Sequence, residues 1–467
     1  METIRTQTLV IGGGPGGYVA AIRLAQLGKE VVVVEQENVG GVCLNVGCIP
    51  SKALITAASH LDEIRHSADM GIHVDGVTVD FAKMQSWKQS VVSKLTGGVA
   101  QLLKGNKVKT MKGSAQFKSP QEVLVISGGV ETLVCAEDVI IATGSKPIEI
   151  PGFAFDGRRV LSSTHALALT EIPKRMVVIG GGYIGLELGT AYAKLGTKVT
   201  VVEAMDQVLP GFDPEMARLL SRRLKQLEVT VLLGAKAKGW QEGTDGAQVT
   251  IEQNGTPVRL DCDVVLVTVG RKPHTAGLNL QQVGVTIDAN GFVPANDKQQ
   301  TNVPHIYSIG DVAGQPMLAH KASREGEVAA EVIAGKASAF DARSIPAVVF
   351  TDPEIATAGL TEAQATEAGY TPITGRFNFA ANGRALTYGN AEGFVKVVAD
   401  KESQVLLGIH IIGHGASDLI AEATLALEMG AVLDDLSSTI HAHPTLPEAL
   451  MEAIKAVKGE AIHAMNK

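Results

Sequence analysis

Cysteine and aromatic residues are scarce in this sequence. Only four cysteines occur among 467 residues, at positions 43, 48, 135 and 262, and aromatic residues make up 4% of the chain. So few cysteines in a chain of this length exclude a fold held together by disulfides. A bridge between two of them would therefore belong to catalysis and not to the scaffold.

An excess of basic charge and a long apolar run are also absent. The chain carries 41 Lys and Arg against 49 Asp and Glu, a formal net charge of −8. This mild acidity argues against nucleic acid or an anionic membrane as the main partner. Glycines and a proline interrupt the apolar stretch 9–22, so we expect no membrane span. Without a signal-peptide pattern, we expect the cytoplasm of a bacterium or, for a processed form, the mitochondrial matrix.

Glycine, in contrast, is abundant, with 51 residues, and several belong to an internal repeat. Residues 9–35 and 177–203 both read as an apolar strand, a glycine turn, an amphipathic helix and a second strand. The matched positions are Gly12 with Gly180, Gly14 with Gly182, Gly17 with Gly185, and Glu35 with Glu203. In this dinucleotide-binding fingerprint the glycines allow a tight turn, and the helix N-terminus faces a pyrophosphate. The repeat predicts two nucleotide cofactors; a second copy kept only for folding is the alternative.

The acid at the end of each repeat indicates which nucleotide binds. A carboxylate at this position accepts hydrogen bonds from ribose hydroxyls and repels a 2′-phosphate. From Glu203 to Met216 the sequence contains no Arg or Lys that could hold such a phosphate. We therefore expect NAD, and not NADP, in the second copy.

Cys43 and Cys48 lie in GGVCLNVGCIPSK, shortly after the first fingerprint, and are typical of a redox-active pair. Five positions on a regular helix separate two Cα atoms by at least about 7.5 Å. A disulfide tolerates roughly 7 Å, so the first turn has to be distorted, and Gly47 makes this easier. Cys48 is expected at a helix N-terminus, which lowers a thiol pKa. The alternative is a pair of buried structural cysteines, the role we expect for Cys135 and Cys262.

The segment HAHPTLPE near the C-terminus allows two interpretations. His443 shares this half of the chain with His410, His414 and His441, and a single histidine is often structural. Thr445 and Glu448 fit a helix capping box, with Pro447 in the first turn. A thiol-transfer reaction, however, needs a group that takes and returns a proton near neutral pH, which suits imidazole.

These motifs together resemble the pyridine nucleotide-disulfide oxidoreductases over essentially the whole chain, and most closely the members that oxidise dihydrolipoyl groups. The resemblance implies an α/β fold with two Rossmann-like dinucleotide-binding domains, for FAD and NAD, and a C-terminal α+β dimerisation domain. It implies that Cys43 and Cys48 form the redox disulfide, with Cys48 nearer the flavin. It also implies that His443 is the acid/base and that Glu448 orients it.

The same resemblance implies a set of cofactor contacts and no metal site. Lys52 is expected beside the flavin, paired with Glu187. The FAD contacts are expected at Gly12, Gly14, Gly17, Glu35, Lys52, Ala115, Thr143, Gly144, Asp311, Met317, Leu318, Ala319 and His320. The NAD contacts are expected at Gly180, Gly182, Gly185, Glu187, Glu203 and Gly270.

Turns rich in proline and glycine suggest the domain borders. We expect an FAD-binding domain over 1–148, an NAD-binding domain over 149–276, a central domain completing the FAD site over 277–345, and an interface domain over 346–467. In the last of these, 394–400 and 405–413 read as strands, and 416–430 and 447–458 read as helices.

The resemblance implies a homodimer that serves a 2-oxo acid dehydrogenase or glycine cleavage complex, with lipoyl domains and the E2 core as partners. The expected reaction is oxidation of protein-bound dihydrolipoyl groups with reduction of NAD. Two alternatives stay open: a reductase for another disulfide, and a flavoprotein that serves as a docking subunit.

Overall fold

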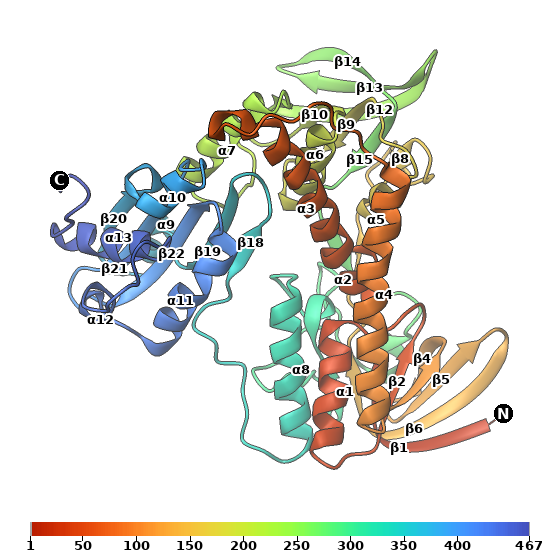
Figure 1. Cartoon of the computed structure of the whole chain (residues 1–467). Coiled ribbons are helices and arrows are strands. Elements are labelled where there is room, and N and C mark those ends of the chain that lie inside the picture. Colours follow the sequence, from red (N-terminus) through yellow and green to blue (C-terminus); the bar gives the residue numbers. More distant parts are fainter. Residues whose placement is uncertain (1, 467) are drawn as a thin grey trace.

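The repeated pattern folds into the same local structure twice in the computed structural model, which describes residues 2–466 (Figure 1). The first copy comprises β1 (Glu2–Ile11), α1 (Pro15–Gln26) and β2 (Val31–Glu35). The second comprises β9 (Arg175–Ile179), α6 (Tyr183–Lys194) and β10 (Lys198–Val202). In both copies the two strands pair in parallel, as the fingerprint requires.

Close backbone contacts explain why glycine recurs in these turns. Gly12 and Gly180 have φ angles of 107° and 103°, which side chains disfavour. A Cβ at Gly17 would lie 1.9 Å from the carbonyl oxygen of Gly12, and one at Gly185 would lie 2.4 Å from that of Gly180. Both distances are far below van der Waals contact, so each helix can approach its turn only because these positions lack a side chain.

The first region is built on a seven-stranded sheet in the order β3-β2-β1-β6-β5-β4, with β17 paired to β6. The segment 277–345 thus returns to the first sheet, and its helix α8 lies against α1 (Figure 1). The further strands are β3 (Lys109–Lys112), β4 (Ser114–Ser119), β5 (Glu122–Ser127), β6 (Val130–Ile141) and β17 (Ile306–Ser308). The further helices are α2 (Gly41–Val46), α3 (Cys48–Arg65), α4 (Phe81–Gly105) and α8 (Ala319–Ile333).

The second region has a five-stranded parallel sheet in the order β11-β10-β9-β15-β8 and a separate antiparallel sheet, β12-β13-β14. The short antiparallel ladder of β7 (Ser145–Pro147) and β16 (Arg271–Pro273) connects it to the first region. The other strands are β8 (Val160–Leu161), β11 (Thr230–Leu232), β12 (Ala235–Gly243), β13 (Gly246–Gln253), β14 (Thr256–Cys262) and β15 (Val264–Val267). Its other helices are α5 (Ser163–Leu167) and α7 (Pro214–Gln226).

The third region, blue in Figure 1, is an antiparallel sheet in the order β18-β19-β22-β21-β20. Alternate residues of its central strands serve two cores: Val395 and Ile411 pack with the helices of this region, whereas Phe394 and Ile412 join the core of the second region. Its strands are β18 (Ala347–Val349), β19 (Glu354–Gly359), β20 (Pro372–Asn378), β21 (Phe394–Asp400) and β22 (Leu406–Gly413). Its helices are α9 (Glu362–Glu367), α10 (Gly383–Thr387), α11 (Ala416–Met429), α12 (Leu433–Ser437) and α13 (Glu448–Lys458).

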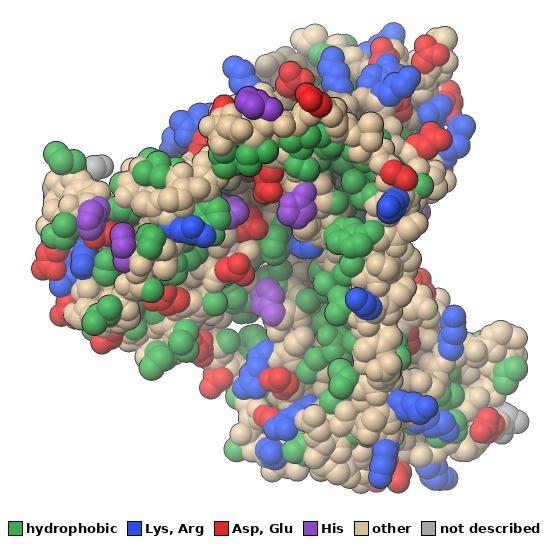
Figure 2. Space-filling model, in the orientation of Figure 1, with side chains coloured by type: hydrophobic (Ala, Val, Ile, Leu, Met, Phe, Trp, Pro, Cys, Tyr) green, Lys and Arg blue, Asp and Glu red, His purple; other side chains and the backbone are tan. Residues whose placement is uncertain are grey.

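The predicted fold class is confirmed, and the expected strands and helices of the last region are present within a residue or two. The exact domain borders stay predictions. On the face shown in Figure 2, basic and acidic side chains are interspersed.

One stretch, Gly41–Arg65, is long and apolar enough by length and composition to cross a membrane. In the structure it is two helices that meet at Gly47, and both line the cavity described below.

Gly375 on β20 tests how closely α13 approaches the sheet. A Cβ there would lie 2.3 Å from the carbonyl oxygen of Ala453 and 2.4 Å from the backbone nitrogen of Val457. Because the backbones would have to separate, we expect Gly375→Ala to lower the free energy of unfolding by about 1–3 kcal/mol. Gly97→Ala on α4 is the control, since a Cβ there meets nothing within 4 Å. It should stabilise by about 0.5–1 kcal/mol. Thermal and denaturant unfolding measure both; equal stabilities would contradict this packing.

Candidate active site

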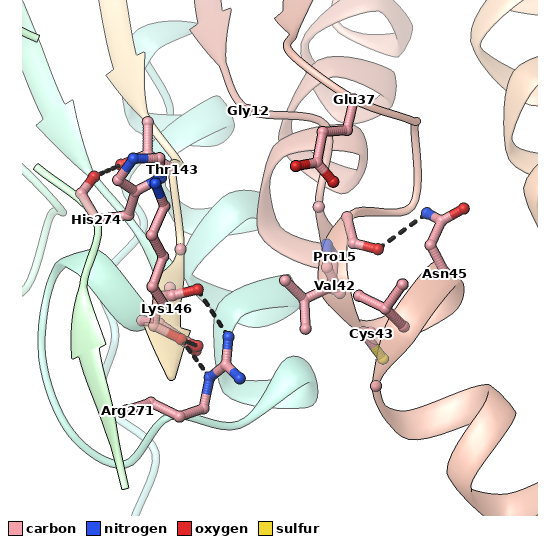
Figure 3. Close-up of a pocket in the computed structure, with 18 of the residues that line it drawn as sticks. Gly12, Pro15, Glu37, Val42, Cys43, Asn45, Thr143, Lys146, Arg271 and His274 are labelled. Carbon is pink, nitrogen blue, oxygen red and sulfur yellow. Dashed lines mark hydrogen bonds between the residues drawn. The ribbon is translucent and has the colours of Figure 1, made fainter. Parts of the chain in front are cut away.

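A cavity of about 820 Å³ lies at the carboxyl ends of β1, β2 and β6, where an open α/β sheet binds its ligands. In Figure 3, Thr143, Lys146 and Arg271 face Val42 and Cys43 across it. The predicted site residues that line it are Gly12, Gly14, Glu35, Cys43, Cys48, Lys52, Ala115, Thr143, Gly144, Glu187, Asp311, Met317 and Ala319. Its volume is of the size that holds a cofactor or a drug-sized ligand.

Several predicted cofactor residues lie elsewhere. Gly17 is buried beneath the first glycine turn, Leu318 precedes α8, and the ring of His320 is 2.7 Å from the carbonyl oxygen of Pro346. None of these three lines the cavity. The predicted NAD contacts Gly180, Gly182, Gly185, Glu203 and Gly270 also lie outside it, around the second fingerprint. The two fingerprints therefore form separate sites, which meet at the start of α6.

The acid of each repeat holds its own glycine turn. Glu35 accepts hydrogen bonds from the backbone N–H of Gly13 at 2.7 Å and of Glu37 at 2.7 Å. Glu203 accepts equivalent bonds from Gly181 at 2.6 Å and Met205 at 2.8 Å. Each carboxylate oxygen has a second lone pair, so a ribose hydroxyl can still donate to it.

Open space lies in front of both glycine turns. A Cβ built on Gly14 would find its nearest heavy atom at 3.8 Å, and one on Gly182 would meet nothing within 4 Å. Each helix N-terminus faces this space with backbone N–H groups that suit an anion. The residues present therefore fit a dinucleotide pyrophosphate at both turns.

The helix that carries the cysteine pair is interrupted, as the spacing predicted. α2 ends at Val46, Gly47 has φ −136° and ψ −110°, and α3 begins at Cys48. This break brings Cys43 and Cys48 within hydrogen-bonding contact. All four cysteines are free thiols in the structure. Of the other two, Cys262 is buried in the core as expected, whereas Cys135 is only half-buried.

The two thiols of the pair differ in acidity. The hydrogen bond from Cys43 lowers the pKa of Cys48 to about 7; burial opposes this shift, and the ammonium of Lys52 adds to it. The same hydrogen bond, together with burial, raises the pKa of Cys43. Cys48, at the N-terminus of α3, is therefore the sulfur that carries negative charge near neutral pH.

The predicted pair of Lys52 and Glu187 is present and connects three regions. Lys52 Nζ on α3 lies 2.7 Å from Glu187 Oε2 on α6. Glu187 Oε1 accepts a hydrogen bond of 2.9 Å from the backbone N–H of Phe350, just after β18. Only 3% of Glu187 is exposed, so this carboxylate depends on its partners.

Arg271, which the sequence analysis missed, lines the cavity from the β7–β16 ladder. Its Nε and Nη2 donate to the hydroxyl and carbonyl oxygens of Ser145, each at 2.7 Å. The Ser145 hydroxyl in turn donates to Asp311. A signal existed, because Gly144 and Gly270 are followed by similar segments, Ser-Lys-Pro and Arg-Lys-Pro, which pair with each other. Tyr183, Lys146 and His274 were missed as well.

Glu448 performs both tasks that the sequence left open. Its Oε1 accepts from Nδ1 of His443 at 2.9 Å, and its Oε2 accepts from the backbone N–H of Thr445 at 2.8 Å. The Thr445 hydroxyl instead donates to the carbonyl oxygen of Ala442, so the reciprocal half of the capping box is missing. Burial alone would raise the pKa of Glu448, but the bonds from Thr445 and His443 lower it.

His443 is exposed, unlike His410 and His441. Its side chain is 78% exposed, and Nε2 has no partner among residues 2–466. In contrast, His410 is buried, and both ring nitrogens of His441 are hydrogen-bonded. His443 does not line the cavity of its own chain. Its free nitrogen is thus available to a group that lies outside this chain.

Two family models match the chain. The model described as pyridine nucleotide-disulphide oxidoreductase matches residues 6–326, and that family's dimerisation domain matches residues 345–454. The family and the homodimer predicted from the sequence are thereby confirmed.

Relatives of similar length have one name in common. The chain is 54% identical to the dihydrolipoyl dehydrogenase of Geobacillus stearothermophilus, over 99% of this chain and 98% of that protein. It is 51% identical to that of Haloferax volcanii, with the same shares covered. The structure of LpdA from Mycobacterium tuberculosis matches with a TM-score of 0.90 at 27% identity, over 96% of this chain and 99% of that one. The chain belongs to the pyridine nucleotide-disulphide oxidoreductase family.

Proposed function

We propose that this protein oxidises dihydrolipoyl groups and reduces NAD, through FAD and the pair of Cys43 and Cys48. The observation that carries this proposal is the interrupted helix, which presents both sulfurs to a cavity between two dinucleotide turns. The predicted enzyme and its cofactors, FAD and NAD, agree with the full-length similarity to dihydrolipoyl dehydrogenases.

The first glycine turn, Glu35 and Lys52 would hold FAD, and the second turn with Glu203 would hold NAD. Bound FAD supplies a two-electron carrier between the cysteine pair and NAD. The carboxylate of Glu203 disfavours the 2′-phosphate of NADP. Tyr183 and Glu187 line the cavity from the start of α6, where the two sites approach each other.

The sulfur chemistry follows from the unequal acidity of the pair. His443 takes the proton of a substrate thiol, and the resulting thiolate attacks Cys43 of the disulfide. Cys48 leaves as the thiolate because its pKa is lower. The second substrate thiol then loses its proton and attacks the substrate sulfur bound to Cys43. The lipoyl disulfide leaves, Cys43 takes up a proton, and two electrons remain on the pair.

His443 is proposed to act on the cysteine pair of the partner subunit. It lies in the dimerisation domain, is 78% exposed and is absent from the cavity lining of its own chain. Glu448 fixes its ring through Nδ1 and leaves Nε2 to move the proton. Each active site of the homodimer would then be completed by the other subunit.

The lipoyl domains and the E2 core of a 2-oxo acid dehydrogenase complex are the proposed partners. The related proteins named above are bacterial or archaeal, which favours the cytoplasm over the mitochondrial matrix. A reductase for another disulfide is the second candidate, since a flavoprotein disulfide reductase of Escherichia coli matches at 26% identity and a TM-score of 0.85. The much higher identity to dihydrolipoyl dehydrogenases favours the first.

The acidity of Cys48 can be measured in the Cys43→Ser holoenzyme, where a hydroxyl replaces the thiol donor. Cys48 is protonated below its pKa and reactive above it, so alkylation by iodoacetamide should rise with a midpoint near 7. An ordinary thiol has a midpoint of about 8.5. Cys43→Ala removes the donor and should move the midpoint upward.

Mass spectrometry of each peptide follows this reaction, with Cys262 as an internal control, because burial raises its pKa to about 12. Identical midpoints near 8.5 in both variants would contradict the proposed leaving group.

Mixed dimers test the contribution of the partner subunit. In a dimer of one Cys48→Ser and one His443→Ala subunit, one of the two sites keeps both native residues if His443 acts across the interface. We expect about half the wild-type rate of NAD reduction by dihydrolipoamide. The two homodimers should each lose at least about two orders of magnitude.

Two affinity tags on co-expressed subunits isolate the mixed dimer, and FAD content confirms that each variant is folded. An inactive mixed dimer would place His443 with the cysteines of its own chain.

A further inference from the structure

Residues 350–352, just after β18, contact two helices that belong to different cofactor sites. α3 begins at Cys48, and α6 begins after the glycine turn of the second fingerprint. The segment itself lies in the dimerisation domain. The dimerisation domain carries neither a dinucleotide fingerprint nor the cysteine pair, whereas the other two regions carry one fingerprint each.

Phe350 contacts both members of the ion pair near the cavity. Its backbone N–H donates to Glu187 Oε1 at 2.9 Å, and its ring centre lies 4.5 Å from Lys52 Nζ. A cation over an aromatic ring is attracted to it, so the ring supports the lysine while the backbone supports the carboxylate. One residue therefore stabilises the N-terminal halves of both helices.

At the other end of these helices, Asp352 contacts α6 and α7 directly and is connected to α3 through two shared cations. Its Oδ2 lies 2.9 Å from Lys194 Nζ on α6 and 2.7 Å from Arg223 Nη2 on α7. The same two cations lie 3.7 Å and 3.2 Å from Oδ2 of Asp62 on α3. Burial would raise the pKa of Asp352, but Lys194 and Arg223 lower it, so the carboxylate is charged.

The contacts at the two ends lie far apart on the helices but come from one short segment. Lys52 and Asp62 are ten residues apart on α3, about 15 Å, and Glu187 and Lys194 are seven apart on α6, about 10 Å. The intervening Thr351 is buried, and its hydroxyl donates to the carbonyl oxygen of Pro353 at 2.9 Å. The segment thus has a fixed shape that spans the surface shared by the two helices.

We propose that residues 350–352 strap α3 and α6 together and that Asp352 is a positioning residue for transfer between FAD and NAD. The strap holds the helix that starts at the redox cysteine against the helix that starts at the NAD turn. This inference rests on the proposed function only for the binding of FAD and NAD. A shift of α6 would change the approach of NAD to the flavin, whereas the cysteine pair would stay in place on the first region.

The test separates the two half-reactions of the holoenzyme by anaerobic stopped-flow absorbance. In Asp352→Asn we expect flavin reduction by saturating NADH to slow roughly tenfold or more, since small misplacements of reacting groups cost rate steeply. Flavin reduction by dihydrolipoamide should stay within twofold of wild type. A role limited to stability would lower the melting temperature without separating the two rates.

Glu215→Gln is the matched control. Glu215 pairs with Arg376 and Lys396, so it also connects the second and third regions, but from α7 and away from the α3–α6 surface. Both half-reactions should remain within twofold of wild type in this variant.

Arg223→Gln is the second variant, and it decides the question if Asp352→Asn does not fold. It removes one of the two cations that Asp352 and Asp62 share, the other being Lys194, and should reproduce the selective loss with NADH. Unchanged NADH rates in the folded variants, or an equal fall of both half-reactions, would overturn the strap. If wild type is reduced by NADH but not by dihydrolipoamide, the proposed substrate fails while the NADH arm still tests the strap.

Discussion

The buried carboxylate of Glu187 is the contact on which the arrangement of the three regions depends. It accepts from Lys52 at 2.7 Å, four residues after the redox cysteine that begins α3, and from the backbone of Phe350 at 2.9 Å. Glu187 itself is the fifth residue of α6, the helix that follows the second glycine turn. A carboxylate with 3% exposure is stable only while these partners are present, because an uncompensated buried charge costs about 3–5 kcal/mol. The ion pair therefore holds the cysteine helix, the NAD helix and the dimerisation domain in one geometry.

The repeat supplies the two sites that this geometry connects. In each copy a carboxylate at the end of the second strand, or one residue after it, binds the glycine turn, with bonds of 2.7 Å at Glu35 and 2.6 Å at Glu203. The same local structure thus presents two helix N-termini to two dinucleotides. Between them, the break at Gly47 brings two sulfurs of unequal acidity to the cavity, so the more acidic sulfur lies at the N-terminus of α3. The reaction needs both the two dinucleotide sites and the cysteine pair, because electrons pass from the substrate dithiol to the cysteine pair and then through FAD to NAD.

Much of this could be predicted from the sequence where the cause is local. Steric contacts within one turn require Gly17 and Gly185, and helix geometry alone required the distortion between Cys43 and Cys48. The contacts of Arg271 with Ser145 and of Phe350 with Glu187 join residues more than 120 positions apart. Helix and strand periodicity reports neither contact, and only the similar segments after Gly144 and Gly270 pointed to the first. The sequence also could not show which histidine is exposed, because His441 and His443 occur in the same short motif. In the structure both ring nitrogens of His441 are hydrogen-bonded, whereas Nε2 of His443 is free. Glu448 could not be assigned to one role from the sequence, because it has two roles in the structure. One carboxylate oxygen binds the ring of His443, and the other binds the backbone at the start of the helix.

The chain carries two electrons from a dithiol through its cysteine pair and FAD to NAD. An anaerobic assay of the FAD-loaded enzyme measures this transfer, with dihydrolipoamide or reduced glutathione as donor and NAD or NADP as acceptor. We expect rapid NADH formation from dihydrolipoamide, little NADH from glutathione and little NADPH from either donor. If NADH reduced the enzyme but no NADH formed from dihydrolipoamide, the dihydrolipoyl group would not be the electron donor.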